Sequence, residues 1–168
     1  MVKILVMAEV RWLDENEQRA WRSYVRATRL LDGAIQRDLA CHGFSHDEYE
    51  ILVNLSEQPC HAARMSELAQ SVVNSRSRLT HTVGRLENRG YVRREASPDD
   101  RRGVICVMTD EGFSALETAA KSHVSGIRSN LLDQMSREEF IALGEALEGV
   151  RRHLEGDRRR DFVKDRPV

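Results

Sequence analysis

Hydrophobic residues recur at spacings of three and four along most of the chain, which predicts a mainly helical protein. The first stripe predicts a long helix over about residues 14–39. The turn "CHGFS" ends this helix, because Gly43 suits the position that follows a helix. Ser45 and Glu48 have the spacing of a capping box, so a second helix is predicted to begin there.

The middle of the chain predicts two helices followed by a hairpin. "EQPCHAAR" is predicted to be a loop, and "MSELAQSVV" a short helix capped by Ser66. "SRSRLTHTVGRLENRG" predicts a helix that buries Leu79, Val83 and Leu86 and stops at Gly90. "YVRRE" and "VICVM" have the composition of short strands, and the charged tip "SPDDRRG" joins them.

Two long amphipathic helices are predicted after the hairpin. Thr109 is expected to cap the first, whose apolar stripe covers residues 116–131. Ser136 and Glu139 form a second capping box, which opens a final helix through Leu154. These stripes exceed what one small lobe could cover, so they favour association with a second chain.

Charge is distributed unevenly along a chain whose net charge is only −1. Residues 74–103 hold eight arginines against four acidic residues, so this segment carries +4 and the remainder −5. A basic patch on an acidic body is typical of a polyanion-binding face. The three cysteines, Cys41, Cys60 and Cys106, make no disulfide framework, which suggests a cytoplasmic protein. "VKILVMAEV" is too short to span a membrane, so no membrane partner is predicted.

A short helix, a turn and a second helix predict a helix-turn-helix unit, whose second helix can lie in the major groove of DNA. Arginine, serine, threonine and histidine on its exposed face can reach base edges and phosphates. The hairpin that follows is then a wing, whose arginines are drawn to a narrow minor groove. Asp100 is close enough along the chain to orient Arg102. The predicted DNA-binding residues are Arg76, Ser77, Arg78, Thr80, His81, Arg85, Asp100, Arg101 and Arg102.

The segment "MSELAQSVVNSRSRLTHTVGRLENRGYVRREASPDDRRGVICVMTDEG" resembles the MarR family of bacterial transcription regulators. The resemblance rests on the helix-turn-helix, the "LENRGYVRR" step, the wing pair Asp100 and Arg102, and "MTDEG". It implies a homodimer that reads a pseudo-palindromic operator in double-stranded DNA. It also implies a repressor released by a small anionic or phenolic ligand, with no cofactor and no enzymatic activity.

The predicted fold is mainly α with a small β-hairpin wing, a winged helix-turn-helix flanked by N- and C-terminal dimerisation helices. The predicted parts are an extension (1–13), a dimerisation region (14–44 and 110–155), a DNA-binding domain (45–109) and a charged tail (156–168). An effector pocket needs aromatic walls and a cation. The candidates for it are Trp21, Tyr24, Arg26 and Tyr49, with core packing as the alternative for the two tyrosines.

Other functions remain open on the cysteines and histidines. Cys60 lies in a loop beside His61 and Arg64, and basic neighbours favour thiol reactivity, so a redox-sensing regulator is an alternative. A small Cys/His enzyme would need Cys60 and His61 to aim at each other, which adjacent loop residues seldom do. The cysteines and histidines match no zinc spacing, so no metal is predicted. A winged helix used only for protein contacts would not need arginines at both groove-facing positions.

Overall fold

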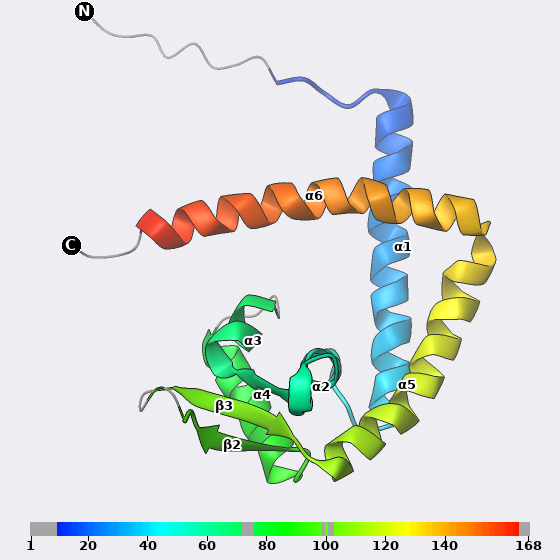
Figure 1. Cartoon of the computed structure of the whole chain (residues 1–168). Helices are drawn as coiled ribbons and strands as arrows, with labels where there is room; N and C mark the ends of the chain where they lie inside the picture. The colour runs from blue at the N-terminus through cyan, green and yellow to red at the C-terminus, as the bar shows by residue number, and fades with distance from the viewer. Residues whose placement is uncertain (1–9, 72–75, 99, 101–102, 165–168) are drawn as a thin grey trace, which may run out of the picture.

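The computed structural model describes residues 10–71, 76–98, 100 and 103–164, which form a winged lobe joined to three long helices (Figure 1). The elements are α1 (Glu15–Ala40), α2 (His46–Ser56), η1 (Pro59–His61), β1 (Ala62–Arg64), α3 (Met65–Ser71), α4 (Arg76–Asn88), β2 (Val92–Ala96), β3 (Val104–Met108), α5 (Asp110–Asn130), η2 (Leu132–Gln134) and α6 (Arg137–Lys164). The predicted fold class, mainly helical with a small hairpin wing, is confirmed.

Helix ends follow the local capping signals. The Asp14 side chain forms a capping box at the start of α1. At its end the Phe44 N–H donates to the Leu39 carbonyl at 3.0 Å, while Gly43 adopts a φ of +73°. Gly90 ends α4 in the same way, with a φ of +74°. A side chain would be strained at both glycines, so these residues set where the two helices stop.

The winged lobe has one compact core between helices and sheet. Leu52 and Leu55 of α2 pack with Val83 and Leu86 of α4, and all four are fully buried. The sheet has the order β1-β3-β2 and is antiparallel, with Cys106 of β3 at its buried centre. Because α4 is anchored by this core on one side only, its other side is left for contacts outside the lobe.

Two predictions in the loop region are wrong. Residues predicted as loop form η1 and the strand β1, which pairs with the free edge of β3. The pairing partner lies far along the chain, so the local pattern of two alanines and an arginine gave no signal. Ser66 is not an N-cap, because α3 begins at Met65. The Glu67 side chain instead accepts from the Arg64 N–H at 3.1 Å.

The long helices α5 and α6 begin at the predicted caps. Thr109 accepts from the Gly112 N–H, and Ser136 and Glu139 form the predicted capping box. The predicted end of the last helix near residue 154 is wrong, because α6 continues to Lys164. Arginine and glutamate have high helix propensity, so a charged segment without an apolar stripe can extend a helix that is already formed.

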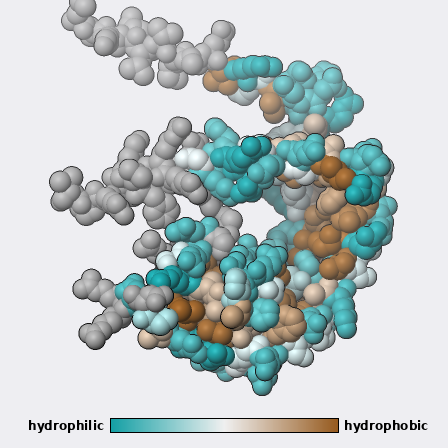
Figure 2. All heavy atoms as spheres, viewed as in Figure 1, coloured by the Kyte–Doolittle hydropathy of each residue, from teal (hydrophilic) through white to brown (hydrophobic). Residues whose placement is uncertain are grey.

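Apolar side chains on α1, α5 and α6 remain uncovered by this chain. Trp21 on α1 is 57% exposed, and Val150 on α6 is 53% exposed. Figure 2 shows hydrophobic residues gathered along the α5 side of the molecule, and an opening between α6 and the winged lobe. Among the side chains that the structure describes, the other exposed large apolar residues on these helices are Tyr24, Leu30, Val124, Ile141, Leu147 and Leu154.

The Gly112→Ala variant should lose stability, because the first turn of α5 lies directly on the backbone at Tyr91. A Cβ at position 112 would stand 2.1 Å from the Tyr91 carbonyl oxygen. We expect a loss of at least about 1–3 kcal/mol in the free energy of unfolding, measured by urea denaturation. Gly84→Ala in α4 is the matched control. A Cβ there meets nothing within 4 Å, so it should add about 0.5–1 kcal/mol. Equal effects would contradict the steric explanation.

Candidate nucleic-acid interface

Helix α4 presents a polar face opposite the core of the lobe. Leu79, Val83 and Leu86 are buried as predicted. The predicted DNA-binding residues Ser77, Arg78, Thr80 and His81 are all exposed. The side chain of Arg76, which begins α4, lies outside the described part of the structure. One amphipathic helix therefore supplies both the anchor and a continuous polar surface.

A buried carboxylate fastens α4 to α2. Glu48 is only 6% exposed, and its Oε1 accepts from Arg85 Nε at 3.1 Å. The Arg89 guanidinium lies 3.9 Å from Oε2 of the same carboxylate, and it lies over the rings of Phe44 and Tyr91, at 5.0 and 4.6 Å from their centroids. This contact gives Arg85 a structural role between the two helices, and the predicted contact of Arg85 with DNA stays a prediction.

A second carboxylate of α2 holds the most exposed of these arginines. Asp47 Oδ2 accepts from Arg78 Nε at 2.8 Å. The Asp47 side chain is 18% exposed, whereas that of Arg78 is 64% exposed. The ion pair therefore joins a largely shielded acid to a cation that extends from the surface. Sequence reasoning identified Arg78 and missed Asp47, because 31 residues separate them.

The strands of the wing carry ion pairs of their own. Arg94 Nε donates to Glu87 Oε2 at 2.9 Å, and these hydrogen bonds hold the pKa of the Glu87 carboxyl below its ordinary value. Arg93 Nε donates to Glu95 at 2.6 Å. Glu87 and Glu95 are already subtracted in the +4 count for this segment. Glu48 and Asp47 lie outside it, so their pairs with Arg85 and Arg78 lower the positive surface below that count.

The tip of the wing is closed by backbone hydrogen bonds. The Ser97 N–H donates to the Gly103 carbonyl at 2.9 Å, and the Gly103 N–H donates to the Asp100 carbonyl at 2.8 Å. Arg101 and Arg102 lie outside the described residues, so the predicted contact between Asp100 and Arg102 stays a prediction. The Asp100 carboxylate is 3.9 Å from Nη1 of Arg64, at the end of β1. Sequence reasoning missed Arg64 because it did not predict β1.

Comparison with known proteins identifies the family to which this fold belongs. The MarR family model matches residues 44–104, from the turn before α2 to the first residue of β3. AbsC, a MarR family regulator from Streptomyces coelicolor, is 40% identical, with a TM-score of 0.84 over 88% of this chain and 99% of that one. The chain belongs to the MarR family of transcriptional regulators. It is therefore a regulator and not an enzyme, as predicted.

Two further relatives bear on the MarR interface. Sco3205 of Streptomyces coelicolor, a MarR family regulator whose structure was solved in complex with DNA, is 42% identical over 88% of this chain and 93% of that one, with a TM-score of 0.83. The HTH-type transcriptional regulator PecS of Dickeya dadantii is 31% identical over 134 residues, 79% of this chain and 80% of that protein.

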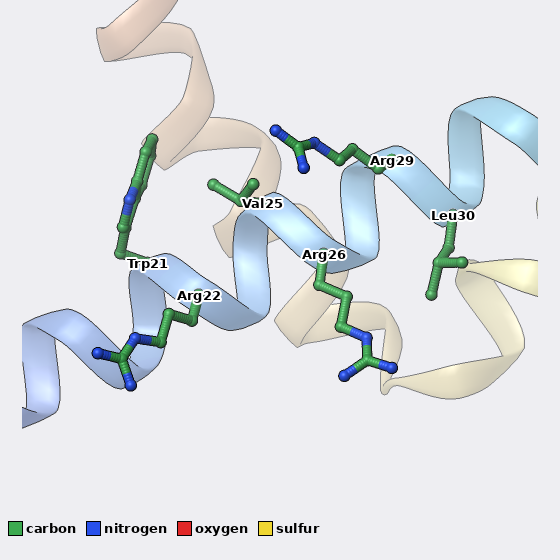
Figure 3. A pocket seen from close by; sticks show the side chains of 6 residues that line it. All are labelled: Trp21, Arg22, Val25, Arg26, Arg29 and Leu30. Atoms are coloured by element: carbon green, nitrogen blue, oxygen red, sulfur yellow. The ribbon is translucent and has the colours of Figure 1, made fainter.

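The four predicted effector-pocket residues do not lie together in this MarR chain. Trp21 and Arg26 line a hollow of about 480 Å³ on α1, and Tyr24 stacks beside Trp21 with ring centroids 5.9 Å apart. Tyr49 instead packs in the lobe core against His123, with ring centroids 4.7 Å apart, and burial raises its pKa. Core packing, the alternative for Tyr49, is what the structure has. The hollow also includes Arg22, Val25, Arg29 and Leu30 (Figure 3).

The cysteines occupy different environments. Cys106 is buried, and burial raises the pKa of its thiol to about 12. Cys60 is exposed and has a φ of +55°, while the His61 ring packs on Phe113 with centroids 5.1 Å apart. Among the described residues there is no group of three or more metal-ligating side chains. No helix in the described ranges has the length and hydropathy to cross a membrane.

The contact between Arg64 and Asp100 predicts that these two residues act together on DNA affinity. Asp100→Ala should weaken binding although it removes a negative charge, because the acid holds the wing against β1. The two side chains are partly exposed, so their coupling energy should be about 0.2–1 kcal/mol. A double-mutant cycle of Arg64→Ala and Asp100→Ala, read by fluorescence anisotropy on duplex DNA, measures this coupling. Glu111→Ala, an acid on α5, is the control. Tighter binding by Asp100→Ala would contradict the prediction.

Proposed function

We propose that this MarR family regulator binds a pseudo-palindromic operator as a homodimer, through α4 and the wing. The observation that carries the proposal is the exposed face of α4, with Arg78 extended from it beside the wing. A relative of 42% identity that was solved with DNA supports it. The groups proposed to touch DNA are those of Arg76, Ser77, Arg78, Thr80 and His81 on α4 and of Arg101 and Arg102 on the wing, with Asp100 as the orienting acid.

A second copy of the chain is the proposed cover for the long helices. Exposed apolar residues follow the faces of α1, α5 and α6, and so long a stripe on a monomer would promote association. A two-fold dimer would carry two winged lobes and so two recognition helices. Two such helices read two half-sites related by the same two-fold axis.

Repression with release by a small ligand is the proposed mode of regulation. MprA of Escherichia coli, a relative named as a transcriptional repressor, supports repression. The hollow on α1 supports an effector, because it combines the Trp21 ring with the cations of Arg22, Arg26 and Arg29. In Figure 3 two rows of side chains on a single helix form this hollow, so a partner helix must close it. An anionic aromatic compound fits this chemistry.

Redox control through Cys60 is the second candidate, and one observation favours it. Cys60 is exposed, and both Cys60 and His61 have positive φ values, of 55° and 52°. Residues other than glycine rarely adopt this backbone conformation without strain. Modification of the thiol would therefore act on a turn that directly precedes β1, the strand that carries Arg64.

Footprinting should show two protected half-sites about 10 base pairs apart, centre to centre, in a pseudo-palindrome. The reason is that each subunit carries one recognition helix and the dimer is two-fold. The measurement uses hydroxyl-radical footprinting on genomic fragments that the wild-type protein retains. A single asymmetric site would contradict the proposal that a two-fold dimer binds two half-sites.

Arg78→Ala should reduce discrimination between sequences. If Arg78 contacts a guanine, the loss on the preferred duplex should be about 1–3 kcal/mol, with a smaller loss on random DNA. Binding to both duplexes is measured at one salt concentration, because phosphate contacts depend strongly on salt. Equal losses on the two duplexes would show that Arg78 touches only phosphate.

Cys60→Ser should abolish any response of DNA binding to peroxide. The thiol is the only exposed cysteine in the described winged lobe, since Cys106 is buried and Cys41 lies at the end of α1. Peroxide titrations of wild type and Cys60→Ser, read as DNA affinity, test this. Identical titration curves would remove the redox candidate and leave ligand control.

A further inference from the structure

We propose that Asp47 is a positioning residue that sets how selectively Arg78 reads DNA. This inference rests on the proposed DNA-binding function. Asp47 lies in the first turn of α2, outside the helix that meets DNA, and the established family membership assigns it no role. Its Oδ2 accepts from Arg78 Nε at 2.8 Å.

Because Asp47 contacts the Nε atom of Arg78, the contact controls how the guanidinium plane is oriented. A guanidinium is planar and has five N–H donors in a fixed fork, so an acceptor at Nε fixes the orientation of the plane. Arginine reads guanine through two parallel hydrogen bonds to O6 and N7, which require a defined plane. An Arg78 side chain held by Asp47 therefore loses less conformational freedom when it meets a base.

Burial separates Asp47 from an ordinary surface partner. Its side chain is 18% exposed, beside the buried carboxylate of Glu48, which holds Arg85 two helical turns further along α4. The Arg85 side chain is 44% exposed, whereas the Arg78 side chain is 64% exposed. Glu48 thus fixes the helix, and Asp47 fixes the more exposed of these two arginine side chains.

The two possible roles of Asp47 predict opposite signs. An acid that acts only by its charge repels DNA, so Asp47→Ala would tighten binding to every duplex. A positioning acid supports the specific contact, so Asp47→Ala should weaken binding to the preferred duplex. The affinity for random DNA should stay the same or increase. The ratio of the two affinities is therefore the decisive quantity.

The test uses the full chain and two probes: a duplex enriched by the wild-type protein from a random-sequence library, and a random-sequence duplex of equal length. Asp47→Ala should lower the ratio of affinities roughly tenfold, within the range of one lost bidentate contact. Asp47→Asn, whose amide oxygen can still accept from Nε, should keep most of the discrimination. Glu50→Ala removes a carboxylate from the same helix and is the matched control; it should leave the ratio unchanged.

A double-mutant cycle completes the test. In the Arg78→Ala background, Asp47→Ala should have no further effect on the ratio, because the acid acts through that arginine. Thermal unfolding of each variant shows whether α2 is intact, and the retained random-duplex affinity shows that the lobe still binds DNA. A tenfold change that persists without Arg78, or an unchanged ratio in Asp47→Ala, would overturn the positioning role. A wild-type protein that enriches no duplex would overturn the proposed function itself, and the inference with it.

Discussion

The buried carboxylate of Glu48 is the contact on which the orientation of the recognition helix depends. It accepts from the Ser45 N–H at 2.8 Å, which caps α2, and from Arg85 Nε at 3.1 Å, which binds α4. A buried charge without a partner would cost several kcal/mol, so the two helices can separate only if the acid becomes solvated. Apolar packing between α2 and α4 fixes their distance, and this ion pair fixes their rotation about each other.

The arginines of the lobe that pair with acids differ in how far their side chains remain exposed. Arg85 and Arg89 are held by Glu48, and Arg94 by Glu87, so their charges are compensated within the lobe. Arg78 is also paired, yet it remains the most exposed of them. A basic count from sequence cannot make this distinction, because it shows neither which acid pairs with each arginine nor how far each side chain is exposed. The fold therefore concentrates its capacity for DNA at few positions.

Local signals in the sequence predicted most of the fold, and long-range contacts account for what it missed. Capping boxes at Ser45 and Ser136, and the glycines at 43 and 90, are decided within a few residues, so they could be predicted. Strand β1 exists only because β3 pairs with it, and Arg85 meets Glu48 across 37 residues. Among the effector candidates, Tyr49 was misplaced for the same reason, because it packs in the lobe core while Trp21 lies on the open face of α1.

The end of α1 connects the open helical face to the recognition helix. Arg89, at the end of α4, donates to the Gly43 carbonyl at 2.8 Å and stacks on the Phe44 ring. Both residues belong to the turn that closes α1, and the hollow with Trp21 lies on that same helix. A helix transmits a tilt along its length because its backbone hydrogen bonds resist bending. A ligand that changed the tilt of α1 would therefore move Leu39 and Phe44, which belong to the core of the lobe, and with them the end of α4. In the proposed dimer, two lobes tilted in this way would no longer match the spacing of two half-sites.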